Sequence, residues 1–473
     1  MSSDSVVVAT TSASPTTSDV GRVFDSIQAI DACDLPIPRV EIELSSAEDD
    51  LAPMDEWRDA SRVMALVRLH SHPLGVLYLD GRAGRSRRAH AAGIWAALQP
   101  RVDAHLAGDG LPPARDLDDL AASRLPKPPD CERARDAVLS RPPLITVVVA
   151  TRDRPESLRA CLTSLLATTY RRFEIVVVDN DPTDDGAATM VADEFESVRY
   201  VRENRRGLAS AHNRGLDVAQ GQIVAFVDDD VLVDRHWLTA IAQGFAETDD
   251  VGCVTGLILP EQLETPAQLL LEHRGGYGKG FDLKVFDTAG NRPDDPLFPF
   301  AAGQLGSGAN MAFDVEMLRG MGGFDTALGV GTRARGGDDM SGFFRTVVAG
   351  HRLVYQPSAI VWHRHYRDMA ALQNMARGCG VGMGAYLASS LLHEPRMIID
   401  LIRCSPQALA KAFLPQPISG ESRPHPWPAE LVNVERRGLL AGPGAYGVSR
   451  WRAHRARGDA ARRQHRTDER CDS

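Results

Sequence analysis

The sequence lacks the features that mark membrane, secreted or nucleic-acid-binding proteins. Its 473 residues contain no uninterrupted apolar stretch long enough to span a bilayer. Residues 1–20 are rich in Ser and Thr, without the basic start and apolar centre of a secretory signal. The formal net charge of -10 gives no general attraction to nucleic acid. We therefore expect a cytoplasmic protein.

Cysteine is also scarce, with seven residues that show no paired spacing. Their odd number and scatter argue against a disulfide framework and against a structural zinc site, and they fit a reducing compartment. Hydrophobic residues make up 43% of the chain and charged residues 25%, as in ordinary globular proteins. The length suffices for two or three domains.

The N-terminal part is predicted to contain a tail and a module. Residues 1–19 are expected to be disordered. Residues 20–141 are expected to form a small α+β module of unknown role, with a hairpin over residues 63–79 and an Ala-rich helix over residues 87–106. This module shows no pattern typical of a chemical site.

Residues 142–366 alternate between apolar strands and amphipathic helices, which predicts a doubly wound, mixed but mostly parallel sheet. The strands are continuous apolar runs, as expected when helices cover both faces of a sheet. The segment 251–300 is less regular and rich in Gly and Pro. We expect strands over residues 145–150, 173–178, 198–201, 223–227, 351–355 and 359–362.

The C-terminal part is predicted to be a helical extension over residues 367–413, followed by a Pro-rich and basic tail over residues 414–473. Alternating glycines over residues 378–384 follow no strand, so they indicate close packing. The basic residues 450–466 would either contact anionic lipid headgroups at the inner face of a membrane or stay solvated.

Three consecutive carboxylates, Asp228, Asp229 and Asp230, follow the strand predicted over residues 223–227. Sheets of this kind carry their functional groups at the carboxyl ends of strands. Adjacent acids repel each other unless a cation lies between them, and Mg²⁺ is often shared between carboxylates and phosphates. The triplet predicts a metal–diphosphate site, with a solvated acidic turn as the alternative.

Further polar groups occupy similar positions. The first strand ends in Thr151–Pro155, which lacks the glycines of a dinucleotide fingerprint or a phosphate-binding loop. Asp179 ends the second strand, where it would bind a base or ribose, or else cap a turn. Asp338 and Asp339 precede a short helix. Asp339 is a candidate general base for a hydroxyl nucleophile, with helix capping as the alternative.

Two other patterns have two interpretations each. His363 and His365 lie on one face at the end of a strand, so that one of them is either a metal ligand or a structural histidine. Residues 207–215 begin a helix with small residues. These residues either let a ligand approach the backbone or allow tight packing of a helix on a sheet.

In combination, these motifs resemble glycosyltransferase family 2, which has the nucleotide-sugar-binding GT-A fold. The resemblance covers about half the chain, residues 142–366. It implies a metal-dependent, inverting transfer of a sugar from a nucleotide-diphosphate donor to an acceptor hydroxyl, with Mn²⁺ or Mg²⁺ as cofactor. The acceptor would be a glycan, a lipid-linked molecule or a small molecule. The matching segments are residues 147–155, 176–180, 207–215, 226–230, 307–310, 322–325, 337–339 and 355–363.

The resemblance also implies residue roles. Asp339 matches the base that activates the acceptor, and Asp338 the acid before it. Asp228 and Asp230 match the Asp-x-Asp motif that holds ribose, metal and diphosphate, and His363 matches a position near the metal. Donor contacts are implied for Thr151, Asp153, Asp179, Asn213, Asp228 and Asp229.

The sequence departs from the family on the acceptor side. Ser341 stands where a further acid is frequent, and Gly342 stands where a larger apolar residue is usual. Two other functions therefore stay open. One is a non-catalytic relative that binds nucleotide sugars or glycans. The other is a sugar nucleotidyltransferase, although the loop after the first strand lacks the glycines such an enzyme needs.

Overall fold

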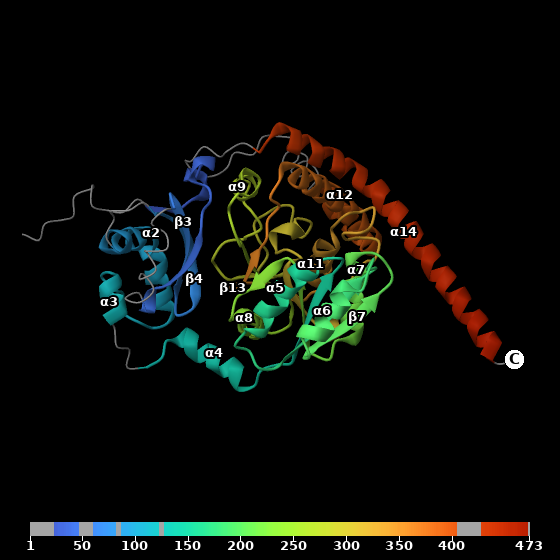
Figure 1. Ribbon diagram of the computed structural model, residues 1–473, viewed down its shortest axis with the longest axis horizontal. Helices are drawn as coiled ribbons and strands as arrows, with labels where there is room; N and C mark the ends of the chain where they lie inside the picture. The colour runs from blue at the N-terminus through green and yellow to red at the C-terminus, as the bar shows by residue number, and fades with distance from the viewer. Residues whose placement is uncertain (1–22, 47–59, 82–86, 123–126, 404–426, 472–473) are drawn as a thin grey trace, which may run out of the picture.

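The computed structural model describes residues 23–46, 60–81, 87–122, 127–403 and 427–471. The N-terminal module lies at one end, the sheet-containing domain in the middle, and two long C-terminal helices beyond it (Figure 1). The tail predicted over residues 1–19 lies outside the described residues. None of the helices in the described ranges combines the length and apolarity that crossing a membrane requires.

The N-terminal module is a four-stranded sheet in the order β1-β4-β3-β2. Val63, Leu77 and Ile94 are among the buried residues that join this sheet to the helices packed on it. The predicted hairpin and Ala-rich helix are both present. The elements are β1 (Val23–Phe24), β2 (Arg39–Glu43), β3 (Arg62–Leu69), β4 (His72–Asp80), α2 (Arg87–Gly108) and α3 (Leu117–Ala122).

The central domain contains a nine-stranded mixed sheet. Eight strands follow the order β11-β13-β10-β12-β8-β5-β6-β7, and β9 pairs with β13. The strands from β8 to β7 run parallel, whereas β12 is antiparallel to both of its neighbours. The strands are β5 (Ile145–Thr151), β6 (Phe173–Asn180), β7 (Val198–Glu203), β8 (Ile223–Asp228), β9 (Val231–Val233), β10 (Val251–Pro260), β11 (Lys284–Phe286), β12 (Asn310–Asp314) and β13 (Arg352–His363).

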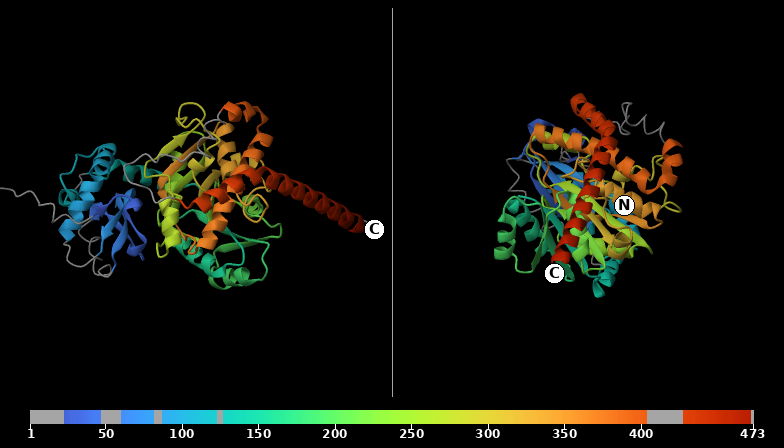
Figure 2. Two further views of the ribbon diagram at one scale, coloured as in Figure 1. Left: turned by 90° about the horizontal axis from the view of Figure 1, so that it is seen from above. Right: turned by 90° about the vertical axis from the view of Figure 1, so that its right-hand side faces the viewer.

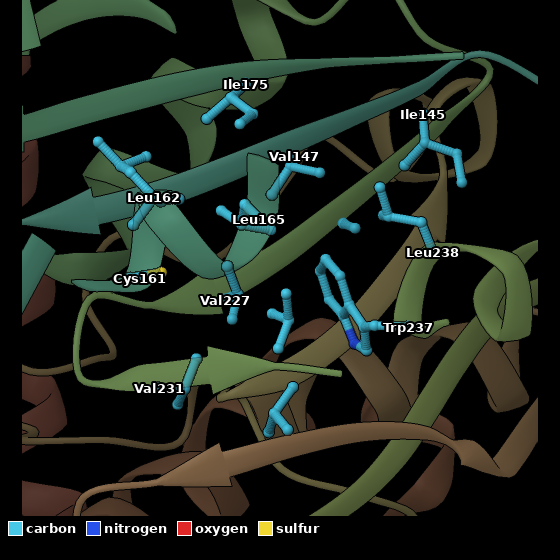
Figure 3. Packing of buried hydrophobic residues seen from close by; sticks show 14 of the residues in the cluster. Ile145, Val147, Cys161, Leu162, Leu165, Ile175, Val227, Val231, Trp237 and Leu238 are labelled. Carbon is cyan, nitrogen blue, oxygen red and sulfur yellow. The ribbon is translucent and has the colours of Figure 1, made fainter. Parts of the chain in front are cut away.

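Helices cover both faces of this sheet, as the apolar strands predict. Val147 and Val227 face a core that includes Leu162, Leu165 and Trp237 (Figure 3). The neighbouring residues of the same strands point to the opposite face. One face is covered by α5 (Pro155–Leu166), α6 (Gly186–Glu194) and α8 (Trp237–Ala246), and the other by α7 (Leu208–Val218), α10 (Val315–Gly320) and α11 (Asp338–Val348).

The sequence prediction misses β9, β10, β11 and β12 and divides β13 into two strands. Gly256 interrupts the strand pattern of β10, although a Cβ there would lie 2.1 Å from the Ala359 carbonyl oxygen. The register of β10 against β13 shifts at Gly256, which marks an irregularity in the pairing. Gly256 therefore lies where the backbones of β10 and β13 approach each other closely.

Two helices form the C-terminal part, α12 (Met369–His393) and α14 (Ala429–Cys471). They pack side by side, and α14 extends beyond the rest of the protein (Figures 1 and 2). A Cβ on Gly380 or Gly384 would lie 2.1 or 2.2 Å from carbonyl oxygens of α14. The alternating glycines therefore allow close packing. The segment predicted as a basic tail is helical over residues 429–471, and residues 404–426 lie outside the described ranges.

Candidate active site

The pairing of strands brings predicted site residues together at the carboxyl ends of the parallel strands. Thr151 pairs with Asp179, and Ala150 pairs with Asp228, across parallel strands. The end of β13 reaches the same place, because the Arg364 amide donates to the Asp230 carbonyl oxygen at 3.0 Å. Residues from several strand ends and from the loop after β8 thus surround one site.

Asp228, Asp230 and His363 offer three ligand atoms that lie within 4.8 Å of one another. Asp230 Oδ1 is buried, has no hydrogen-bond partner among the described residues, and lies 3.8 Å from His363 Nε2. Carboxylate oxygens and an imidazole nitrogen suit cations such as Mn²⁺. These residues therefore fit a divalent cation, as the sequence predicts.

The middle acid of the triplet has protein partners instead. Thr151 Oγ1 donates to Asp229 Oδ2 at 2.7 Å. Arg154 Nη1 lies 3.1 Å from Asp229 Oδ1 and 3.0 Å from Asp230 Oδ2, so it links the two acids. Burial raises the pKa of Asp229 to about 6, and Arg154 opposes this shift. Arg154 thus supplies part of the positive charge that the triplet needs.

Burial raises the pKa of Asp228 well above its usual range, and the charges of Asp230, Asp229 and Asp338 add to the shift. A positive charge beside such a carboxyl favours its ionised form. The electrostatics of the site therefore favour a bound cation.

A chain of side chains continues behind His363. Its Nδ1 lies 3.0 Å from His365 Nδ1, and His365 Nε2 lies 2.8 Å from Glu272 Oε1 on α9 (Pro266–His273). Glu272 accepts a hydrogen bond from the Nε2–H group of His365. His365 Nδ1 is then unprotonated and accepts a hydrogen bond from the Nδ1–H group of His363. This assignment leaves a lone pair on His363 Nε2. Burial lowers the pKa of His363 to about 4, which keeps the ring neutral.

The acid pair lies at the start of α11. Gly337, which precedes the pair, has a positive φ of 89°. The Gly308 amide donates to Asp339 Oδ2 at 3.0 Å. Burial raises the pKa of Asp339 to about 6, and the charge of Asp338 contributes to the shift. Asp338 Oδ2 lies 3.6 Å from His212 Nδ1 on α7. Asp339 is therefore held by a hydrogen bond, whereas Asp338 Oδ2 and His212 Nδ1 are buried without a hydrogen-bond partner among the described residues.

The predicted donor-binding residues differ in their surroundings. Asp179 is fully buried and accepts from the Tyr200 hydroxyl at 2.8 Å. Asp179 Oδ1 has no partner within the described ranges, so it has an acceptor to offer a ligand. Asp153 has a φ of 55° and accepts from the Thr183 amide at 2.8 Å. Asp153 therefore stabilises a loop beside the strand ends.

Asn213, which the resemblance predicts to contact the nucleotide-sugar donor, is hydrogen-bonded to the backbone of Phe324. Its Nδ2 donates to the Phe324 carbonyl at 2.9 Å, and its Oδ1 accepts from the Phe324 amide at 2.8 Å. A Cβ on Gly323 would lie 2.4 Å from Asn213 Oδ1. The amide is thus engaged at both ends by one backbone, and it holds the turn at residues 322–325.

Two site residues are not predicted from the sequence. Arg154 lies in the loop after the first strand, whose most visible property is its lack of glycines. Its position directly after a strand end is the signal that could have identified it. Glu272 lies in the irregular segment, 93 residues from its partner His365. No sequence pattern connects these two residues, because the fold alone brings them together.

The fold and the site define an α/β domain whose candidate ligand site lies at the carboxyl ends of its strands. Residues 146–314 match the family model described as Glycosyl transferase family 2. These residues therefore form a family 2 glycosyltransferase domain, as the motifs predict.

Curated relatives are consistent with the family. The chain is 27% identical over 245 residues to the pre-mycofactocin glycosyltransferase of Mycobacterium tuberculosis, covering 51% of this chain and 45% of that protein. It is 24% identical over 231 residues to the glucosyl-dolichyl phosphate glucuronosyltransferase of Haloferax volcanii, covering 46% of this chain and 69% of that protein. The chain thus spans less than half the length of the first of these relatives.

Among solved structures, the chain is similar to a mannosyltransferase from Pyrobaculum calidifontis in complex with GDP-Man and Mn²⁺. The sequence identity is 20%, the TM-score is 0.40, and the match covers 69% of this chain and 81% of the other.

Proposed function

We propose that the protein is a metal-dependent, inverting glycosyltransferase that moves a sugar from a nucleotide-diphosphate donor to an acceptor hydroxyl. The observation that carries the proposal is the convergence of Asp228, Asp230 and His363 at the strand ends. The family match and the names of the curated relatives support glycosyl transfer.

On the donor side, Asp228, Asp230 and His363 would hold Mn²⁺ or Mg²⁺. When bound, the cation supplies positive charge against the diphosphate that leaves as an anion. Thr151 and Arg154 fix Asp229, so that the triplet keeps its shape. Asp179 offers a buried carboxylate oxygen to the nucleoside.

On the acceptor side, Asp339 would take the proton of the attacking hydroxyl. Its pKa of about 6 lies close to neutral pH, where a general base works best. The hydrogen bond from Gly308 fixes one carboxylate oxygen. General base catalysis typically contributes about a hundred- to ten-thousand-fold. Direct attack assisted by one base inverts the anomeric configuration, which is the stereochemical consequence of this proposal.

The acceptor is proposed at the level of its chemistry, as a hydroxyl of a glycan, a lipid-linked molecule or a small molecule. The two relatives have different acceptors in their names, pre-mycofactocin and glucosyl-dolichyl phosphate. The shared domain therefore does not define one acceptor.

The test is a panel of nucleotide sugars incubated with the purified protein, with and without Mn²⁺. Hydrolysis or transfer of one donor is expected only with the metal. Asp230→Asn should abolish the reaction, and Asp339→Asn should stop transfer while donor affinity stays unchanged. Asp193→Asn, which changes an exposed acid of α6, is the control. Full transfer by the Asp339 variant would exclude it as the base, and metal-independent turnover would exclude the metal site.

A further inference from the structure

We propose that the N-terminal module holds a Zn²⁺ ion, bound by His70, His105, Asp109 and Cys131. The four residues come from three separate segments. His70 lies in the turn between β3 and β4, while His105 and Asp109 lie at the end of α2 and just after it. Cys131 lies in the first turn of α4 (Asp130–Ser140). Their ligand atoms all lie within 4.8 Å of one another. This site is separate from the strand-end site, which is formed by Asp228, Asp230 and His363. The zinc proposal does not depend on the proposed function.

The distances among the four atoms lie within about 0.5 Å of those in a tetrahedral zinc site. Asp109 Oδ2 lies 3.0 Å from His70 Nδ1, 3.2 Å from His105 Nε2 and 3.0 Å from Cys131 Sγ. The two histidine nitrogens are 3.2 Å apart, and Cys131 Sγ is 3.9 Å from each of them. Zinc bonds of about 2.0–2.3 Å place tetrahedral ligands about 3.3–3.8 Å apart.

Without a cation, hydrogen bonds crowd a single oxygen. If both histidines donate to Asp109, its Oδ2 accepts from two imidazole N–H groups and from the Cys131 thiol at once. If one nitrogen is unprotonated, its lone pair faces a carboxylate oxygen at 3.0 or 3.2 Å. A cation at the centre accepts lone pairs from all four atoms. The donor set of two imidazoles, a thiolate and a carboxylate is one that zinc prefers.

Surrounding contacts orient the ligands. The Cys131 amide donates to Asp109 Oδ1 at 2.9 Å, which leaves Oδ2 directed at the site. Arg135 Nη2 donates to the His70 carbonyl oxygen at 2.6 Å and fixes the turn. Such hydrogen bonds hold metal ligands in place. His105 and Cys131 also border a cavity between the module and the central domain, which gives the ion a route to the site.

The site has no sequence signature. Thirty-five residues separate His70 from His105, four separate His105 from Asp109, and twenty-two separate Asp109 from Cys131. Because this spacing is irregular, the sequence alone does not identify the four residues as zinc ligands, and its scattered cysteines argue against a zinc site. The ion would join α2 and the turn between β3 and β4 to α4, which packs on α8 of the central domain. Four protein ligands leave no open position, so the site is structural.

The experiment measures metal in the full-length protein, purified without a polyhistidine tag and dialysed. Elemental analysis should find one zinc per chain. Cys131→Ser and His105→Gln should each lower zinc retention at least tenfold. Cys33→Ser, at an exposed cysteine, and Asp230→Asn, in the strand-end site, should keep the zinc. Zinc content well below one per chain in the unaltered protein, or unchanged in both ligand variants, would overturn the proposal.

A second measurement avoids variants that fail to fold. The unaltered protein is loaded with Co²⁺ after zinc removal, and its absorption spectrum is recorded. A tetrahedral Co²⁺ spectrum with a thiolate charge-transfer band supports the site, because Cys131 is its only proposed sulfur ligand. A spectrum of octahedral Co²⁺ without that band contradicts it.

Discussion

His363 and His365 face each other through their Nδ1 atoms at 3.0 Å, and Glu272 accepts from the far side of His365. The three residues select the His363 tautomer whose Nε2 has a free lone pair beside Asp230. Groups of this kind typically change metal affinity about 10–100-fold when they are removed. His365 is thus a positioning residue for the proposed metal site.

The first prediction concerns His365→Phe, which keeps a ring and removes both nitrogens. We expect the affinity for Mn²⁺ to fall about 10–100-fold, measured by titration of the free ion with electron paramagnetic resonance. His351→Asn, at a more exposed histidine paired with Asp250, should leave the affinity unchanged. Equal affinities for His365→Phe and the unaltered protein would show that His363 needs no such partner.

The second prediction is a pH dependence. Burial and Asp338 raise the pKa of Asp339 to about 6. A base must be deprotonated, so the transfer rate should rise tenfold per pH unit below this value and level off above it. The measurement is the rate at saturating donor, acceptor and metal, from pH 5 to about pH 8. A rate that falls as pH rises through about 6 would contradict a basic role for Asp339.

The third prediction concerns the buried hydrogen bond from Thr151 to Asp229. Thr151→Val keeps the branched shape of the side chain and removes the donor. The free energy of unfolding should fall by about 1–3 kcal/mol, because a buried carboxylate loses a partner. The loss should be smaller at pH 5, where Asp229 is mostly protonated. Chemical unfolding of both proteins at pH 5 and pH 8 checks this, and equal losses at both pH values would count against it.

The fourth prediction compares two glycines of α14. A Cβ on Gly442 would lie 2.6 Å from Gly384 Cα, whereas a Cβ on Gly444 would have no neighbour within 4 Å among the described residues. Gly442→Ala should therefore destabilise the helix pair by about 1–3 kcal/mol. Gly444→Ala should stabilise α14 by about 0.5–1 kcal/mol. Thermal unfolding midpoints that move in opposite directions would confirm the packing, and parallel shifts would exclude it.

Much of the fold is predictable from the sequence, because β5, β6 and β8 are continuous apolar runs covered on both faces. The acids at their carboxyl ends, Asp179 and the Asp228–Asp230 triplet, are identifiable from the same pattern. β10 escapes prediction because Gly256 meets the backbone of β13 at Ala359, a contact between distant segments. The hydrogen bonds of Asn213 escape prediction for the same reason, since its partner Phe324 is 111 residues away.

The site residues that the sequence misses are also those defined by distant contacts. Arg154 lies close to the triplet in space but 76 residues away from Asp230 along the chain. The His70, His105, Asp109 and Cys131 cluster has no repeated spacing, so only the packing of α2 and α4 reveals it. Motifs at strand ends are predictable because the sheet fixes their positions. Clusters between separate elements are not.

The glycines of α12 have a consequence for the size of the smallest working enzyme. A Cβ on Gly382 would lie 3.1 Å from Gly336, whose loop leads directly into Asp338 and Asp339. A chain shortened to end at residue 366 would lose the surface that supports this loop. We expect it to retain the sheet and its cation ligands, while the two acids of α11 lose their alignment.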